Sequence, residues 1–226
     1  MTDAAPSLTP AAAPDDLPMD GPELAALIAA KLCHDFISPS GAIMSGLDLL
    51  NDPTAQDMRD DALSLITDSA KKMVALVQFC RVAFGAATTA ERFTGDELQA
   101  LVDGVTAGGR ATLEWGLDGA DYGKLAARAL VNLAYLTVAA LPSGGAAVVS
   151  SRREAGGVVI EGVAEGARAR LKAEAATGLS GQRLTEGLAG QWVQPYWLWL
   201  TAHQAGGSLQ VQAVEGRVTM TARMPA

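Results

Sequence analysis

Two helical stripes of apolar residues, separated by a single break, set the strongest constraint on how this chain can fold. The first stripe advances mostly by three or four residues and comprises Ile28, Leu32, Phe36, Ile43, Leu47 and Leu50. The break is Asn51-Asp52-Pro53. The second stripe alternates steps of four and three and comprises Ala62, Ile66, Ser69, Met73, Leu76, Cys80 and Ala83. This spacing predicts two long antiparallel helices, over about 22–50 and 54–85, joined by a short turn.

Both stripes are narrow, as in a coiled coil, so a single hairpin cannot bury both of its helices. Two hairpins paired in a four-helix bundle would bury them, which predicts a homodimer. Composition agrees with a helical start to the chain. Of the 226 residues, 49% are hydrophobic but only 5% are aromatic, so much of the apolar content is alanine, the best helix former.

His34 lies away from the first stripe. With about 100° of rotation per residue, it lies about 160° to 200° from the nearest members of the stripe, so its imidazole is predicted to point to solvent. Lys31 and Ser38 share its face of the helix, and Asp35 follows it directly. Pro39 falls inside the helical pattern, where it removes a backbone hydrogen bond and should bend the helix. From these positions alone, a surface histidine without a function explains the pattern equally well.

The pattern changes after about residue 89. Strands are predicted near Arg92 and at 112–115, 146–152, 158–163, 208–212 and 217–223, and helices at 96–106, 122–141, within 168–190 and at 195–204. The last two strands form a predicted hairpin across Glu215-Gly216. This alternation predicts an α/β sandwich. The expected α+β protein therefore has a disordered Pro/Ala tail over 1–21, a helical-hairpin domain over 22–86 and an α/β sandwich domain over 90–226.

Charge and composition exclude several classes of function. With 17 Lys+Arg against 25 Asp+Glu, the formal net charge is −8, which argues against direct binding to nucleic acid. Two histidines leave little for a metal site, and two cysteines, Cys33 and Cys80, cannot build a disulfide framework; both thiols are expected to be packed. Because the tail lacks an apolar signal segment and no apolar run is long enough for a membrane span, a cytoplasmic protein with reduced thiols is expected.

The string His34-Asp35-Phe36-Ile37-Ser38-Pro39 resembles the phospho-acceptor box of histidine kinases, and it lies on the first helix of a hairpin, as in that family. The resemblance implies that Nε2 of His34 accepts a phosphoryl group, that Asp35 orients and polarises the ring, and that Ser38 contacts it one turn later. The chemistry is consistent, because a neutral imidazole is nucleophilic near pH 7 and a carboxylate at its other nitrogen strengthens it.

The ATP-binding boxes of histidine kinases, which carry a GHKL-type ATPase domain, are missing from the second half of the chain. Alignment on this resemblance places Leu136 at the magnesium asparagine and Ala139 at the phosphate lysine, while Asn132 matches an earlier asparagine that binds no metal. Residues 161–166 lack the aspartate that reads adenine. Val193-Gln194-Pro195-Tyr196 replaces the glycine-rich phosphate loop, and its proline has no N–H to donate to a phosphate.

The chain combines the predicted fold and phospho-acceptor box of a histidine kinase with the loss of the ATP-binding residues. In this combination it resembles the ChpT family of histidine phosphotransferases from α-proteobacteria. The resemblance covers about residues 22–225. It implies that the receiver domain of a hybrid histidine kinase passes a phosphoryl group from its aspartate to His34, and that His34 passes it to aspartates of response regulators that govern the cell cycle. The receiver brings Mg²⁺, so the chain is expected to need neither ATP nor a metal site of its own.

A basic run at Arg168, Arg170 and Lys172 stands out in this acidic chain. With Lys31, Arg168 and Arg170 are predicted to contact an acidic receiver domain, because opposite potentials raise encounter rates. A solvated helix start explains the run without any partner. Four aromatic residues at helical spacing are predicted to lie in the core: Trp192, Tyr196, Trp197 and Trp199. His203, near a helix end, is expected to be structural.

Three functions remain open. The chain is a phosphorelay transfer protein acting through His34, an ATP-dependent kinase with a divergent nucleotide site, or a non-catalytic scaffold for response regulators. Leu136, Ala139 and Pro195 disfavour the kinase. The motif around His34 favours transfer over a scaffold.

Overall fold

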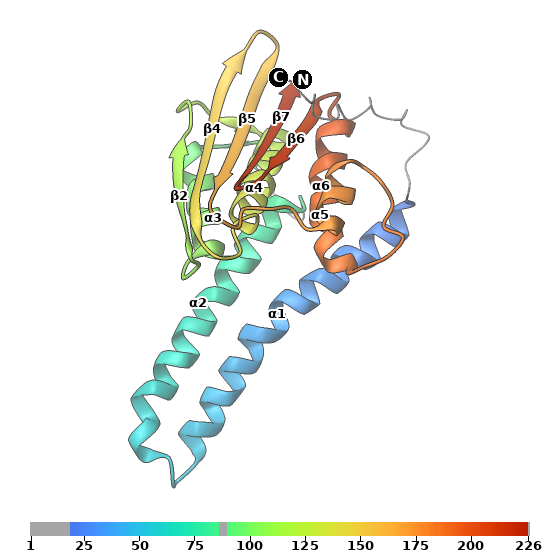
Figure 1. Ribbon diagram of the computed structural model, residues 1–226. Coiled ribbons are helices and arrows are strands. Elements are labelled where there is room, and N and C mark those ends of the chain that lie inside the picture. The colour runs from blue at the N-terminus through green and yellow to red at the C-terminus, as the bar shows by residue number, and fades with distance from the viewer. Residues whose placement is uncertain (1–18, 86–89, 226) are drawn as a thin grey trace.

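The computed structural model describes residues 19–85 and 90–225, and in it a long helical hairpin projects away from a domain built on one sheet (Figure 1). The hairpin consists of α1 (Gly21–Asn51) and α2 (Arg59–Ala83), joined by a turn that contains the short 3₁₀ helix η2 (Gln56–Met58). Asp20 caps α1 by accepting a hydrogen bond from the backbone N–H of Glu23 at 2.7 Å. The predicted hairpin is confirmed, with its break at the predicted position.

Small residues let the two helices of the hairpin approach each other closely. A Cβ atom added at Gly46 would lie 2.6 Å from Cγ1 of Ile66 and 3.1 Å from the carbonyl oxygen of Ala62. Ala62 and Ser69 are buried at this seam, so the second apolar stripe faces α1 as its spacing predicts. Leu47 of the first stripe does not follow the prediction, because its side chain is 40% exposed.

The second domain is built on a five-stranded sheet in the order β2-β4-β5-β7-β6. Only β2 and β4 run parallel, and the other neighbours are antiparallel. The strands are β2 (Ala111–Gly116), β4 (Gly145–Glu154), β5 (Gly157–Glu165), β6 (Ser208–Val214) and β7 (Arg217–Pro225). Two short strands, β1 (Arg92–Phe93) and β3 (Tyr122–Gly123), form a separate antiparallel pair. The predicted C-terminal hairpin is confirmed, with Gly216 at φ 74° in its turn.

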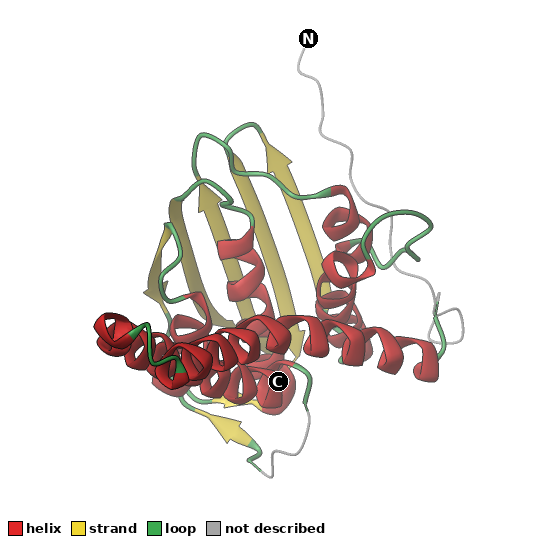
Figure 2. Cartoon of the chain, turned by 90° about the horizontal axis from the view of Figure 1, so that it is seen from below, coloured by secondary structure: helices red, strands yellow, loops and turns green. Residues whose placement is uncertain are grey.

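Helices gather on one side of this sheet (Figure 2). They are α3 (Gly95–Thr106), α4 (Lys124–Ala139), α5 (Ala173–Leu179) and α6 (Ala189–Gln204). The central helix α4 is buried on most of its surface, as expected for a helix that is apolar nearly all round. Gly162 on β5 has no side chain, and this lets Leu133 and Thr137 of α4 pack directly against the strand. The predicted α+β architecture is thus confirmed.

Three boundaries differ from the sequence predictions. Between residues 168 and 188 only Ala173–Leu179 is helical, because turns containing Gly181 and Gly187, both at positive φ, follow it. Helix α6 begins at Ala189 rather than near 195. The predicted tail 1–21 lies outside the described residues up to 18, but Met19 is buried against the aromatic residues of α6.

Across the described residues, 19–85 and 90–225, none of the helices is both long enough and apolar enough to cross a bilayer.

Candidate phosphotransfer site

His34 lies on the outer side of α1, and its side chain is 86% exposed. Its Nδ1 atom lies 3.4 Å from Oδ1 of Asp35. The other carboxylate oxygen, Oδ2, accepts a hydrogen bond from Nζ of Lys31 at 2.6 Å. Because Nδ1 faces the carboxylate, Nε2 is the ring nitrogen that a partner molecule can reach. The prediction of a solvent-facing imidazole is confirmed.

The helix continues through the rest of the motif. Ser38 is exposed one turn after His34, which agrees with its predicted face. Pro39 lies inside α1 and is buried. Since a proline has no N–H, the carbonyl of Asp35 loses its helical donor at this point. The hydroxyl of Ser40 donates to the carbonyl of Phe36 at 2.8 Å within the same turn.

Lys31 is placed differently from the sequence expectation. It lies on the face of His34 in sequence, yet only 9% of its side chain is exposed. Its Nζ atom is held between Asp35 and the ring of Tyr135 on α4, whose centroid is 5.9 Å away. Lys31 therefore lies against the second domain instead of reaching outward, and its predicted contact with a partner remains untested.

A cavity of about 420 Å³ opens beside His34, between α1, α4 and α6. Its walls include the three residues that replace ATP-binding groups, Leu136, Ala139 and Pro195. Arg170 also lines it, as do Lys31, Asp35, Tyr135, Lys172, Leu179, Leu188 and Gln194. The positions that the sequence analysis aligned with ATP-binding groups of kinases therefore line the same cavity as the histidine.

The basic run borders two neighbouring hollows, and Arg170 lines both of them. Arg168, Arg170 and Lys172 are exposed, and the run ends at Lys172, the N-cap residue of α5, so a solvated helix start still explains it without a partner. Arg170 and Lys172 border the cavity beside His34. Arg168 lines a second hollow, next to the β6–β7 turn at Glu215-Gly216, and Arg170 borders this hollow too.

The place of a phosphate loop is occupied by a regular helix. Val193, Gln194, Pro195 and Tyr196 are buried within α6. Trp192, Tyr196, Trp199 and His203 stack in succession along this helix, with ring centroids 4.4, 5.5 and 4.9 Å apart. Trp192 and Tyr196 are core residues as predicted, whereas Trp197 and Trp199 are half-buried. His203 packs on Trp199, in agreement with a structural role.

A buried hydrogen-bond network, which the sequence analysis missed, joins the hairpin to the second domain. The carbonyl of Ala83, at the end of α2, accepts from Nδ2 of Asn132 at 2.8 Å and from Nε1 of Trp197 at 2.7 Å. The side chain of Asn132 in turn accepts from Gln194 at 3.1 Å. The asparagine that aligns with a group that binds no metal in kinases therefore holds the two domains together. Its only sequence signal was an unexplained amide on an otherwise apolar helix.

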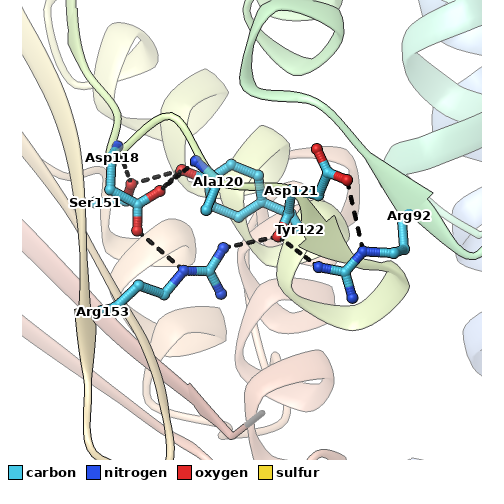
Figure 3. Close-up of polar contacts among 7 residues, drawn as sticks. All are labelled: Arg92, Asp118, Ala120, Asp121, Tyr122, Ser151 and Arg153. Atoms are coloured by element: carbon cyan, nitrogen blue, oxygen red, sulfur yellow. Dashed lines mark hydrogen bonds and ion pairs between the residues drawn. The ribbon is translucent and has the colours of Figure 1, made fainter.

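A second cluster of charged residues lies around the loop between β2 and β3 (Figure 3). Asp118 accepts hydrogen bonds from Tyr122 at 3.2 Å and from Arg153 at 3.0 Å. Arg153 also donates to the carbonyl of Asp121 at 2.7 Å. Burial raises the pKa of Tyr122. Because these groups bind one another, the cluster fastens the loop between β2 and β3 to β4.

No group of three or more His, Cys, Asp or Glu side chains that could hold a metal ion occurs in the described part of the chain.

Comparisons with known proteins agree on one family. The family model of the histidine phosphotransferase C-terminal domain matches residues 95–217. The protein phosphotransferase ChpT of Brucella abortus (strain 2308) is 30% identical over 202 residues, which span 88% of this chain and 95% of that protein. A solved bacterial phosphotransferase, 28% identical, superposes with a TM-score of 0.79 over 92% of this chain and 100% of that chain. The matches span both the hairpin and the sheet domain, and the chain belongs to the ChpT-type histidine phosphotransferases.

Proposed function

We propose that this histidine phosphotransferase carries the phosphoryl group on Nε2 of His34 and moves it between aspartates of receiver domains. The observation that carries the proposal is the placement of one exposed imidazole, at 86%, with its Nδ1 atom turned to a carboxylate. No other described histidine is comparable, because His203 is stacked on Trp199.

The proposed transfer is an in-line displacement at phosphorus. The lone pair of Nε2 attacks the phosphorus of an aspartyl phosphate, the N–P bond forms, and the P–O bond to the receiver carboxylate breaks with its electron pair leaving on that carboxylate. The proton on Nδ1 stays in place, and Asp35 offsets the positive charge of the phosphorylated ring. Attack by a second receiver's carboxylate reverses these changes and frees His34. Ser38, exposed one turn away, supports the phosphoryl group.

The phosphoryl group comes from a receiver in this proposal and not from ATP. Apolar side chains at Leu136 and Ala139, and a proline at 195, stand where ATP chemistry needs an amide, an ammonium and backbone N–H groups. Mg²⁺ arrives with the receiver domain, which holds it beside its own aspartate. The expected donors and acceptors are a hybrid histidine kinase and cell-cycle response regulators, which work in the cytoplasm.

Arg168 and Arg170 are proposed to contact the receiver from two neighbouring hollows, one of which they share. Arg170 borders the cavity beside His34, and Arg168 lies at the β6–β7 turn. Exposed arginines attract an acidic surface without requiring a fixed geometry, so they act mainly on the rate of encounter.

The hairpin is proposed to pair with a second hairpin in a four-helix bundle. Large apolar side chains remain at least 38% exposed along α1, the turn and α2: Ile37, Met44, Leu47, Met58, Leu63, Leu65, Val74 and Val77. Large exposed apolar side chains gathered on one hairpin are typical of an interaction surface. A second copy offers the same surface and would cover it.

One labelling experiment tests the proposed reaction. The protein is incubated with labelled ATP alone and then with a receiver domain that carries labelled aspartyl phosphate. We expect label only from the receiver, complete loss of label in His34→Ala, and unchanged labelling in His203→Ala, which replaces the other histidine of the chain. Label from ATP alone would establish a divergent kinase. Absence of label with either donor would leave a scaffold.

A further inference from the structure

Lys31 is nearly buried although it lies one turn before the exposed His34. Its side chain is 9% exposed, and its ammonium lies 2.6 Å from Oδ2 of Asp35. On its other side is the face of the Tyr135 ring, 5.9 Å from Nζ to the centroid. A lysine side chain is rarely buried unless its charge is paired, because removing an unpaired charge from water is costly. Here the compensating negative charge comes from Asp35, the residue adjacent to the proposed phospho-acceptor.

The two oxygens of Asp35 are divided between two partners. Oδ2 binds Lys31, and Oδ1 faces Nδ1 of His34 at 3.4 Å. An aspartate that lacked the first contact could rotate about its side-chain bonds and turn either oxygen to solvent, since 25% of it is exposed. The contact with Lys31 fixes the plane of the carboxylate and so fixes which oxygen meets the imidazole.

Tyr135 holds the lysine from the second domain. Its ring lies against Phe79 of α2, with centroids 5.4 Å apart, so it is fixed where the hairpin meets α4. At 5.9 Å the cation–π contact is near the outer limit of the useful range and is weaker than the ion pair. It nevertheless places an aromatic face beside the ammonium, on the side contributed by the second domain.

We infer that Lys31 is a positioning residue for phosphoryl transfer, acting on His34 through Asp35, and that α4 takes part through Tyr135. This inference rests on the proposed function of His34. On this inference the sheet domain contributes to the reaction by holding the ion pair between Lys31 and Asp35 in place. The ion pair in turn favours the His34 tautomer that has its proton on Nδ1 and its lone pair on Nε2. A free imidazole prefers the opposite tautomer, so the selection has a measurable signature.

The test compares Lys31→Met, which keeps the length of the side chain and removes its charge, with Lys31→Arg, which keeps the charge. The control is Lys71→Met, because Lys71 also pairs with an aspartate on the same hairpin, at 3.6 Å from Asp68, but is 74% exposed. For each full-length variant, nitrogen NMR of His34 measures the tautomer ratio, and the initial rate of phosphoryl acceptance is measured with a phosphorylated receiver.

We expect Lys31→Met to shift His34 toward the tautomer protonated on Nε2 and to slow acceptance by about 10-fold, in the range of lost positioning. Lys31→Arg should restore both within about 2-fold, and Lys71→Met should match the unmodified protein, on the same positioning argument. Tyr135→Leu should give a smaller shift in the same direction, while Tyr135→Phe retains the ring and should not.

Two results would overturn the inference. In the first, Lys31→Met matches Lys71→Met in both tautomer ratio and rate. In the second, Lys31→Met slows acceptance without changing the tautomer and Lys31→Arg does not rescue it, which would indicate a role in folding alone. The tautomer ratio needs no phosphoryl donor, so it judges the inference even if His34→Ala still accepts label and the proposed function fails.

Discussion

The helical hairpin and the sheet domain differ in how much of their apolar surface is buried within one chain. In the domain, Leu130, Leu133 and Ile160 are completely buried between α4 and the sheet. In the hairpin, Leu63 and Val74 of α2 are 45% and 55% exposed. The core of the domain is therefore formed within one chain, whereas the hairpin leaves apolar side chains that another molecule could cover. The difference separates residues that hold the fold from residues available for assembly and signalling.

Matched truncations test this difference most strongly. Leu133→Ala removes a side chain that packs against Gly162 and is completely buried. We expect it to lower the free energy of unfolding by about 2–5 kcal/mol. Leu63→Ala makes the same chemical change on α2 and should cost less than about 1 kcal/mol in a dilute, monomeric sample. Denaturant unfolding measures both.

Concentration provides the control for this comparison. If hairpins pair, the midpoint for Leu63→Ala should fall further below that of the unmodified protein as concentration rises, because its side chain is then covered by a partner. Equal losses for Leu133→Ala and Leu63→Ala at low concentration would contradict the division between the two regions.

A charge placed on the exposed surface of the hairpin should prevent pairing. Val74→Glu puts a carboxylate at a shallow groove of α2 that is lined by Ile66, Ala70 and Ala75 and also by Lys71. Covering this carboxylate with a second apolar hairpin would remove it from water, which is costly, so we expect the dimer to weaken by at least about 100-fold, roughly 3 kcal/mol. Light scattering at micromolar concentration measures the mass. Val214→Glu, at a 63% exposed valine of β6, is the control and should leave the mass unchanged. A monomeric mass for the unmodified protein would contradict the bundle.

Two glycines of α1 should respond to alanine with opposite signs. Gly46→Ala forces a methyl group against Ile66 and should destabilise the protein by about 1–3 kcal/mol. Gly41→Ala meets no atom within 4 Å and should stabilise it by about 0.5–1 kcal/mol, because alanine is the better helix former. Thermal unfolding distinguishes them, and destabilisation by both would mean that the face of Gly41 is also closely packed.

The periodicity of apolar residues predicted which helices and strands are present better than it predicted the residues at which they begin and end. The hairpin, the sheet strands and α4 follow from apolar spacing, because spacing reflects which face of an element is buried. Segment 168–190 was predicted too helical, since Gly181 and Gly187 permit turns that interrupt it. Pro195 suggested a helix start, which it favours in isolation, but the packing of Trp192 and Val193 extends α6 before it.

Local sequence predicted the exposure of His34 but not the surroundings of Lys31. Exposure depends on rotation around one helix, which the stripe on α1 defines. Burial of Lys31 depends on Tyr135, which is 104 positions later in the chain, 135 − 31, and reaches α1 only through the fold. The hydrogen bonds to Ala83 could not be predicted from the sequence either, because their acceptor is a backbone carbonyl, which every residue type has.

The two cysteines of the hairpin differ in exposure in the same way as its two kinds of apolar residue. Cys33 is exposed beside His34, so the prediction that it is packed is wrong, whereas Cys80 is half-buried on α2. Burial raises the pKa of the Cys80 thiol to about 11, with a smaller raising effect from Asp35 and a lowering one from Lys31. At pH 8 only about one Cys80 thiol in a thousand is ionised, and the thiolate is the reactive form.

A colorimetric disulfide reagent at pH 8 should therefore label one thiol per chain rapidly and the second at least about 100-fold more slowly. The rapid phase should vanish in Cys33→Ser, and two equally fast phases would contradict the burial of Cys80.

The free energy of unfolding should also depend on the ionisation of Cys80. The Cys80 thiol stays neutral in the fold up to about pH 11 but ionises near 9.0 when unfolded. Ionisation then favours the unfolded chain, so this thiol should lower the free energy of unfolding as the pH rises from 9 to 11, an effect that Cys80→Ser should remove.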